Sequence, residues 1–97
     1  MPYWARMMEF YESTEEGQLK ILFTSRSNSL NRGASMEVLL NDAYVAGAKE
    51  NWKTGKVEIR GKESIVKWIK LHCIGTDYYD RERLSFRVVN IRNGEKR

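Results

Sequence analysis

The chain has 97 residues, of which 41% are hydrophobic and 31% charged, and its formal net charge is +4. This inventory supports one small hydrophobic core and excludes both a disordered chain and a second domain. No apolar run approaches the roughly 18 residues that a membrane span requires. The single cysteine excludes an internal disulfide framework. We therefore expect one domain over residues 1–97, in a cytoplasmic and reducing setting, without a membrane partner.

The positive charge is concentrated in the second half of the chain. Residues 1–48 contain four Lys or Arg against six Asp or Glu, whereas residues 49–97 contain thirteen against seven. Clustered positive charge creates a field that attracts polyanions or acidic protein surfaces. The asymmetry therefore directs the search for a binding surface to the C-terminal half.

The first quarter of the chain predicts two strands joined by a short connection. Residues 3–12 alternate in a way that favours a strand, although Trp4, Met7, Met8 and Tyr11 would also fit a helical stripe. Residues 18–24 form a clearer strand, with three large apolar side chains on one face. The segment 12–17 between them is typical of a hairpin connection, and residues 25–35, rich in Ser, Asn and Gly, are typical of a loop.

The segment that follows has two possible interpretations. Apolar and small residues recur at helical spacing over residues 36–55, with Ser35 as a possible N-cap and Gly55 near the C-terminus. Alternatively, residues 43–49 and 55–61 form an antiparallel hairpin around residues 50–54. We prefer the helix, and the alternation over residues 56–60 then predicts a separate strand with Val57 and Ile59 inside.

The C-terminal third predicts a helix and a final strand. Residues 62–74 carry an apolar stripe at i, i+3, i+4, i+7 and i+8 spacing, and Gly75 is suited to the position after a helix C-terminus. Residues 81–91 alternate between apolar and arginine-bearing faces, and residues 92–97 are typical of a frayed tail. The expected core residues are Leu19, Ile21, Phe23, Val57, Ile59, Ile65, Trp68, Ile69, Leu84, Phe86 and Val88.

These elements together predict an α+β fold. The order is β-β-α-β-α-β, and the expected architecture is a single two-layer domain. In it, a four-stranded mixed sheet carries two helices on one face.

The search for catalytic chemistry is negative. His72 is the only histidine, which excludes a site with two His ligands in one chain, and it lies on the apolar stripe of the predicted helix. Cys73 is its neighbour, but adjacent helical residues diverge by roughly 100° and do not face one another. Motifs for phosphate loops and dinucleotides are absent from the sequence. We therefore expect no enzyme activity, no cofactor and no metal.

The remaining candidate is a basic surface that binds nucleic acid. Arginine is suited to phosphate because its guanidinium makes bidentate contacts, and exposed tyrosines can stack on unpaired bases. The candidate residues are Lys56, Arg60, Lys62, Lys67, Lys70, Tyr78, Tyr79, Arg81, Arg83 and Arg87. The sequence leaves open whether the nucleic acid is single-stranded or structured.

Two alternatives to this function remain open. The arginines could serve only to keep the outer face of a strand solvated. The chain could also be a protein-binding inhibitor or adaptor, of the kind encoded by phages and mobile elements, acting on an acidic protein or a nucleoprotein surface. A homodimer is possible under either function, because exposed strand edges can pair across a two-fold axis.

Overall fold

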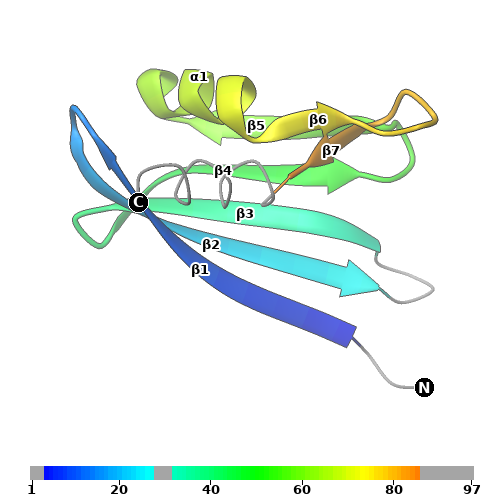
Figure 1. Cartoon of the computed structure of the whole chain (residues 1–97), viewed down its shortest axis with the longest axis horizontal. Coiled ribbons are helices and arrows are strands. Elements are labelled where there is room, and N and C mark those ends of the chain that lie inside the picture. Colours follow the sequence, from blue (N-terminus) through cyan, green and yellow to red (C-terminus); the bar gives the residue numbers. More distant parts are fainter. Residues whose placement is uncertain (1–3, 28–31, 86–97) are drawn as a thin grey trace.

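The structure is a computed structural model that describes residues 4–27 and 32–85, and it is mostly β (Figure 1). Five consecutive strands form one antiparallel sheet in the order β1-β2-β3-β4-β5, and β6 and β7 form a small second sheet. The described residues contain one helix. The prediction of a four-stranded mixed sheet with two helices is therefore wrong. The elements are β1 (Trp4–Thr14), β2 (Gly17–Ser27), β3 (Arg32–Leu40), β4 (Ala43–Asn51), β5 (Lys56–Gly61), α1 (Glu63–His72), β6 (Ile74–Thr76) and β7 (Glu82–Leu84).

The first two strands form the predicted hairpin. β1 and β2 pair in register from Trp4 with Ser27 to Thr14 with Gly17, so only two residues form the turn. Gly17 adopts a φ of 130°, which non-glycine residues rarely reach, and this explains the glycine at the start of β2. Both strands extend further than the sequence pattern indicates, because β2 continues through Ser25 to Ser27 in the segment predicted as a loop.

The helix predicted over residues 36–55 is absent, and the segment forms strands β3 and β4 instead. The turn between them is Asn41–Asp42, and both residues have positive φ, 52° and 66°. Asn and Asp adopt this left-handed conformation more readily than other non-glycine residues, and two such residues in succession are typical of a tight hairpin. A register shift between Val38 and Leu39 breaks the strict alternation of β3, which obscures its strand pattern.

The alternative hairpin around residues 50–54 is present. β4 pairs antiparallel with β5, from Ala46 with Gly61 to Asn51 with Lys56. Residues 52–55 form the connecting turn. The Asn51 side-chain oxygen accepts hydrogen bonds from the backbone N–H groups of Lys53 and Thr54, at 3.0 and 3.2 Å. This local bonding replaces the helical hydrogen bonds that the spacing had suggested.

The predicted C-terminal helix is confirmed as α1. Ile65 and Ile69 are buried, Trp68 is partly buried, and Lys67 and Lys70 are exposed, as the apolar stripe requires. Glu63 lies in the first turn, where a carboxylate interacts favourably with the helix dipole. The helix ends at His72, before Gly75, which lies in β6.

The final strand is shorter in the described part of the chain than the prediction of residues 81–91. β7 covers Glu82–Leu84 and pairs with β6, which the sequence did not predict. Leu84 is buried as expected. The predicted residues Phe86, Arg87 and Val88, and the tail over 92–97, lie outside the described residues.

The hydrophobic core lies between the sheet and a second layer made by α1 and the β6–β7 hairpin, which cover the β4–β5 side of the sheet (Figure 1). Six expected core residues are buried and three, Val57, Ile59 and Trp68, are partly buried. Four residues of the misassigned helix are also buried, Met36, Val38, Ala46 and Ala48, together with Ala34 from the predicted loop and Cys73. Gly61 is required at the end of β5, where it pairs with Ala46 of β4, because a Cβ there would lie 2.4 Å from the Ala46 Cα. None of the described helices is both long and apolar enough to cross a membrane.

Candidate functional site

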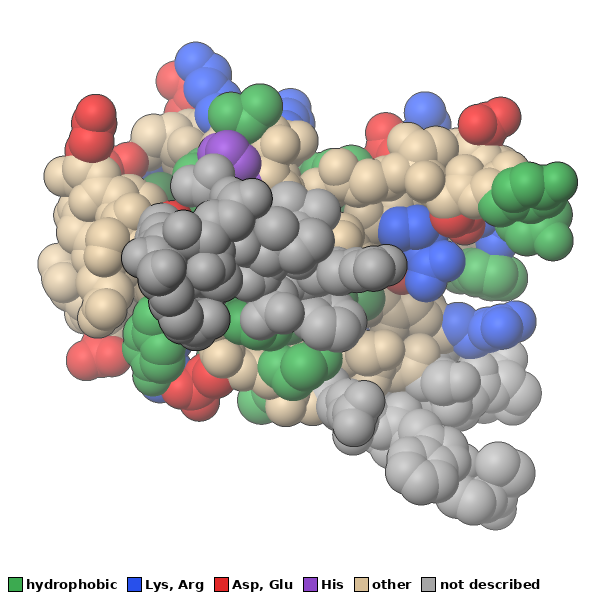
Figure 2. All heavy atoms as spheres, in the orientation of Figure 1, with side chains coloured by type: hydrophobic (Ala, Val, Ile, Leu, Met, Phe, Trp, Pro, Cys, Tyr) green, Lys and Arg blue, Asp and Glu red, His purple; other side chains and the backbone are tan. Residues whose placement is uncertain are grey.

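Several chain turns meet at one end of the molecule. The β4–β5 turn and the β6–β7 turn lie there, beside the end of β2 and the start of β3 (Figure 1). In the space-filling view, Lys or Arg side chains and hydrophobic side chains gather together at this end (Figure 2). We call it the arginine–tryptophan end and define it by Arg32, Trp52, Lys53, Tyr78, Tyr79 and Arg81.

Trp52 is the centre of this surface. It lies in the β4–β5 turn and remains 42% exposed. The guanidinium carbons of Arg32 and Arg81 lie 4.5 and 4.1 Å from the centroid of its ring. The ring therefore joins the start of β3 to the second layer through two cation–π contacts, each worth about 0.5–1 kcal/mol at an exposed site.

Stacking on Trp52 leaves the two arginines able to bind a ligand. A cation–π contact uses the face of the guanidinium plane, whereas its five N–H donors point outward in that plane. Within residues 4–27 and 32–85, no carboxylate forms an ion pair with Arg32 or Arg81. Both groups are thus held in place with their donor edges available to an anion.

Asp77 organises the turn that carries the two tyrosines. One of its carboxylate oxygens accepts hydrogen bonds from the N–H groups of Tyr79 and Arg81, at 2.8 and 3.0 Å. The pKa of Asp77 is held below its usual value, chiefly by the bond from the Arg81 backbone and also by those from Tyr79 and Arg83. The turn presents Tyr78 and Tyr79 at 93% and 76% exposure, with their rings edge to face at 5.4 Å. Exposure of this size is unusual for adjacent aromatic residues and leaves their faces available for stacking.

Arg83, another predicted site residue, has mainly a structural role. Its guanidinium contacts a carboxylate oxygen of Glu50 at 3.0 Å and one of Asp77 at 3.4 Å. The hydrogen bond to Glu50 is the main reason that the pKa of Arg83 is raised. Because two carboxylates already neutralise it, Arg83 is less available to a further anion than Arg32 or Arg81.

A cavity of about 400 Å³ lies beside Trp52 at this end. Its lining combines buried apolar residues with three arginines and the Glu50 carboxylate. The lining residues are Phe23, Ser25, Arg26, Arg32, Gly33, Ala34, Glu50, Trp52, Arg83 and Leu84.

The structure does not bring all the predicted basic residues together. Lys62 lies at the start of α1, where its ammonium pairs with Glu16 of the β1–β2 turn. Lys67 and Lys70 are exposed on α1, toward the opposite end of the molecule from the β4–β5 turn (Figure 1). Lys56 and Arg60 are exposed on the outer side of β5, and Arg87 lies outside the described residues.

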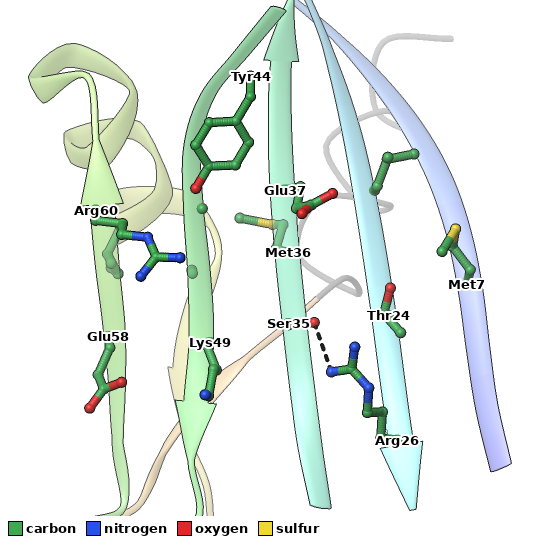
Figure 3. A pocket seen from close by; sticks show the side chains of 14 residues that line it. Met7, Thr24, Arg26, Ser35, Met36, Glu37, Tyr44, Lys49, Glu58 and Arg60 are labelled. Carbon is green, nitrogen blue, oxygen red and sulfur yellow. Dashed lines mark hydrogen bonds between the residues drawn. The ribbon is translucent and has the colours of Figure 1, made fainter. Parts of the chain in front are cut away.

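The sheet has a second candidate site on the face directed away from α1, which we call the open face. A shallow cavity of about 370 Å³ lies there across β1 to β5 (Figure 3). Its polar lining includes Arg26, Ser35, Glu37, Lys49, Glu58 and Arg60, and Tyr44 lies at one side. Arg26 lines both this cavity and the one beside Trp52, so the two sites are neighbours.

Several of these residues were not among those predicted from the sequence. Arg32 was placed in a loop and Trp52, Lys49 and Tyr44 in a helix, so their common surfaces could not be foreseen. The one available signal for Trp52 was its position between polar residues in the alternative hairpin, where a large aromatic side chain has no core to enter.

The remaining chemistry of the described residues is limited. No group of three or more His, Cys, Asp or Glu side chains could hold a metal ion in the part of the chain that the structure describes. His72 is partly buried with its ring centroid 5.6 Å from that of Trp68, and Cys73 is buried.

Comparisons of the chain with models of protein families, with curated proteins and with solved structures found no match.

Proposed function

We propose that the protein is a small, non-enzymatic nucleic-acid-binding protein and that the arginine–tryptophan end is its binding surface. The observation that carries the proposal is the Arg32–Trp52–Arg81 stack, with the exposed Tyr78 and Tyr79 in the adjacent turn. Cationic donors bind phosphates and aromatic faces stack on unpaired bases, which together are the usual components of a single-strand binding surface.

The fixed position of the two arginines supports this function. A long side chain normally loses rotamer freedom when it binds, at a cost of about 0.5–1.5 kcal/mol. Stacking on Trp52 already restricts both side chains in the free protein, so less rotamer freedom is lost when a ligand binds. The stack also holds two positive charges close together, an arrangement that a chain of phosphates would stabilise.

The direct test is a fluorescence-anisotropy titration of a labelled single-stranded oligonucleotide at several salt concentrations. We compare the wild type with the double variant Arg32→Gln/Arg81→Gln. Each lost phosphate contact flattens the log–log salt dependence by about 0.7 on a single strand, so the double variant should flatten it by about 1.4. Binding of the wild type at low salt with an unchanged slope in the variant would contradict the proposed surface.

The matched control is Lys67→Gln/Lys70→Gln, which removes the same charge from α1. It should leave the slope nearly unchanged, because the helix lies away from the arginine–tryptophan end. Replacing Tyr78 and Tyr79 with Ala should weaken binding to single strands by about 1–3 kcal/mol per stacked base and leave duplex binding little affected.

A second candidate function is binding to an acidic protein surface as an inhibitor or adaptor. Trp, Tyr and Arg are the residues most enriched at energetically dominant positions of protein interfaces, and all three occur at this end. Leu71, 75% exposed on α1, adds an apolar contact that nucleic acid would not require. Absence of oligonucleotide binding at low salt would favour this second function.

A further inference from the structure

The two tyrosines of the β6–β7 turn cross at nearly a right angle. The planes of the Tyr78 and Tyr79 rings differ by 87°, and their centroids are 5.4 Å apart. In such an edge-to-face pair, one ring directs its edge at one face of the other, so the remaining ring faces stay open. The exposures of 93% and 76% agree with this arrangement. Each ring can therefore receive a flat ligand, but the two ligands would lie perpendicular to one another.

The turn that carries the two rings is fixed by hydrogen bonds. The Asp77 N–H donates to the Arg81 carbonyl at 2.9 Å, and the Asp80 N–H donates to the Asp77 carbonyl at 3.0 Å. The Asp77 carboxylate also accepts from the N–H groups of Tyr79 and Arg81. Asp80 has a φ of 61°, a left-handed conformation that aspartate adopts more readily than most residues. The backbone therefore holds the two adjacent tyrosines on a sharp bend.

The same turn is attached to the rest of the arginine–tryptophan end. The Glu82 N–H donates to the Gly55 carbonyl at 2.8 Å. The Arg81 side chain passes over Gly55, where a Cβ would lie 3.3 Å from its Cγ, and its guanidinium stacks on Trp52. Both tyrosines lie within three residues of Arg81, at most about 11 Å between Cα atoms. One strand can therefore contact the two rings and this cation together.

The angle between the rings restricts the strand that can use both of them. Neighbouring bases in a stacked strand are parallel and about 3.4 Å apart. Bases on Tyr78 and Tyr79 would instead be nearly perpendicular, so the strand must give up the stacking between them. This costs little for thymine, which stacks weakly on its neighbours, and more for adenine, whose larger ring stacks strongly. The right angle therefore disfavours a strand that stays stacked.

Two coplanar or parallel rings would give the opposite preference. Binding of single strands depends on the strength of base–aromatic stacking and on the flexibility of the backbone. Where a strand keeps its own stacking, the larger adenine ring gains more from an aromatic surface than thymine does. The direction of the preference between thymine and adenine therefore reports how the two tyrosines are used.

We propose that the arginine–tryptophan end selects unstacked, pyrimidine-rich single strands, with two neighbouring bases on Tyr78 and Tyr79 at nearly a right angle to each other. This inference rests on the proposed function and names the class of strand that the surface binds. Arg81, held on Tyr79's side of the turn by Trp52, contacts the phosphates of the same nucleotides.

The test compares two labelled oligonucleotides of equal length, one of thymine only and one of adenine only, by fluorescence anisotropy at one low salt concentration. Their phosphate charges are equal, so the arginines contribute equally to both. We expect the wild type to bind the thymine strand about tenfold more tightly, within the range of one additional stacked base.

Tyr78→Ala leaves a single ring, which imposes no angle on the strand. It should weaken binding to the thymine strand about tenfold and binding to the adenine strand less than about threefold, so that the preference disappears. Tyr78→Phe is the matched control, because it keeps the ring and removes only the hydroxyl, and it should retain the preference. Arg32→Gln/Arg81→Gln should weaken both strands equally and also retain it.

The outcomes separate this inference from the proposed function. Wild-type binding to the adenine strand as tightly as to the thymine strand, or more tightly, would overturn this inference alone. Equal weakening of both strands by Tyr78→Ala would also overturn it, because the second ring would then serve both strands alike. Binding to neither strand would overturn it together with the proposed function.

Discussion

Glu50 is a buried carboxylate at the junction of three strands. It is 7% exposed and lies on β4. Its two oxygens accept hydrogen bonds from the N–H groups of Ala34 on β3 and Leu84 on β7, each at 2.8 Å, and from the Arg83 guanidinium at 3.0 Å. A buried charge is tolerated only when it is fully hydrogen-bonded, and Glu50 meets that condition. It connects the sheet to the second layer just below Trp52.

We expect Glu50→Ala to lower the free energy of unfolding by about 2–4 kcal/mol. The reason is that two buried backbone N–H groups would lose their acceptor, at about 1–3 kcal/mol each. Chemical denaturation followed by circular dichroism measures the change. Glu58→Ala is the matched control, because this carboxylate is exposed on the neighbouring strand, and it should change stability by less than about 0.5 kcal/mol. Equal effects of the two substitutions would show that the Glu50 hydrogen bonds are not what connects the layers.

At the scale of elements, the residues at the ends of a segment predicted its structure better than the spacing of its apolar residues did. The β1–β2 hairpin and α1 were predictable because each combines a regular apolar period with a suitable boundary. The prediction of a helix over residues 36–55 was wrong. Small residues such as Ala43 and Gly47 are compatible with both the helical and the strand period, so their spacing does not distinguish the two. Asn41 and Asp42, both with positive φ, were the stronger signal, and they indicate a hairpin.

The β6–β7 hairpin depends on the ionised form of Asp77, which gives it a pH dependence. The pKa of Asp77 is lower in the folded protein than in the unfolded chain, where it is about 3.9. The folded state therefore binds the proton less readily, and the stabilisation is present above about pH 4. It is lost as the pH falls through the lower, folded-state pKa.

This dependence can be measured by following the Asp77 carboxyl carbon by NMR during an acid titration. We expect a midpoint below about 3.9, and amide signals of Tyr79 and Arg81 that shift with the same midpoint because both N–H groups bind this carboxylate. In Asp77→Asn the amides should lose this transition, since the side chain keeps an acceptor but no longer titrates. A wild-type midpoint at or above 4 would contradict the assigned role of Asp77.

At the scale of the whole molecule, the candidate site brings together residues that are far apart in the sequence. Arg32 begins β3, Trp52 lies in the β4–β5 turn and Arg81 lies in the β6–β7 turn. Only the antiparallel order of the sheet and the placement of the second layer bring them into contact. The basic C-terminal half drew attention to Arg81, Tyr78 and Tyr79. It could not reveal Arg32, because a charge count does not indicate which strand ends are neighbours.

The same folding separates residues that the sequence had grouped. The lysines of α1 lie away from the arginine–tryptophan end, and Lys62 is paired with Glu16. Positive charge at a distance from the contact surface adds to the general attraction of a polyanion but does not hold it. The proposed nucleic-acid binding is therefore expected at the arginine–tryptophan end.

The most direct measurement of this account is an NMR titration of the ¹⁵N-labelled protein with a single-stranded oligonucleotide at low salt. The account predicts that the largest shifts occur at the Trp52 indole and at the amides of residues 52–55 and 77–81. Shifts centred on Lys67 and Lys70 of α1, or no shifts at a stoichiometric excess of the oligonucleotide, would contradict it.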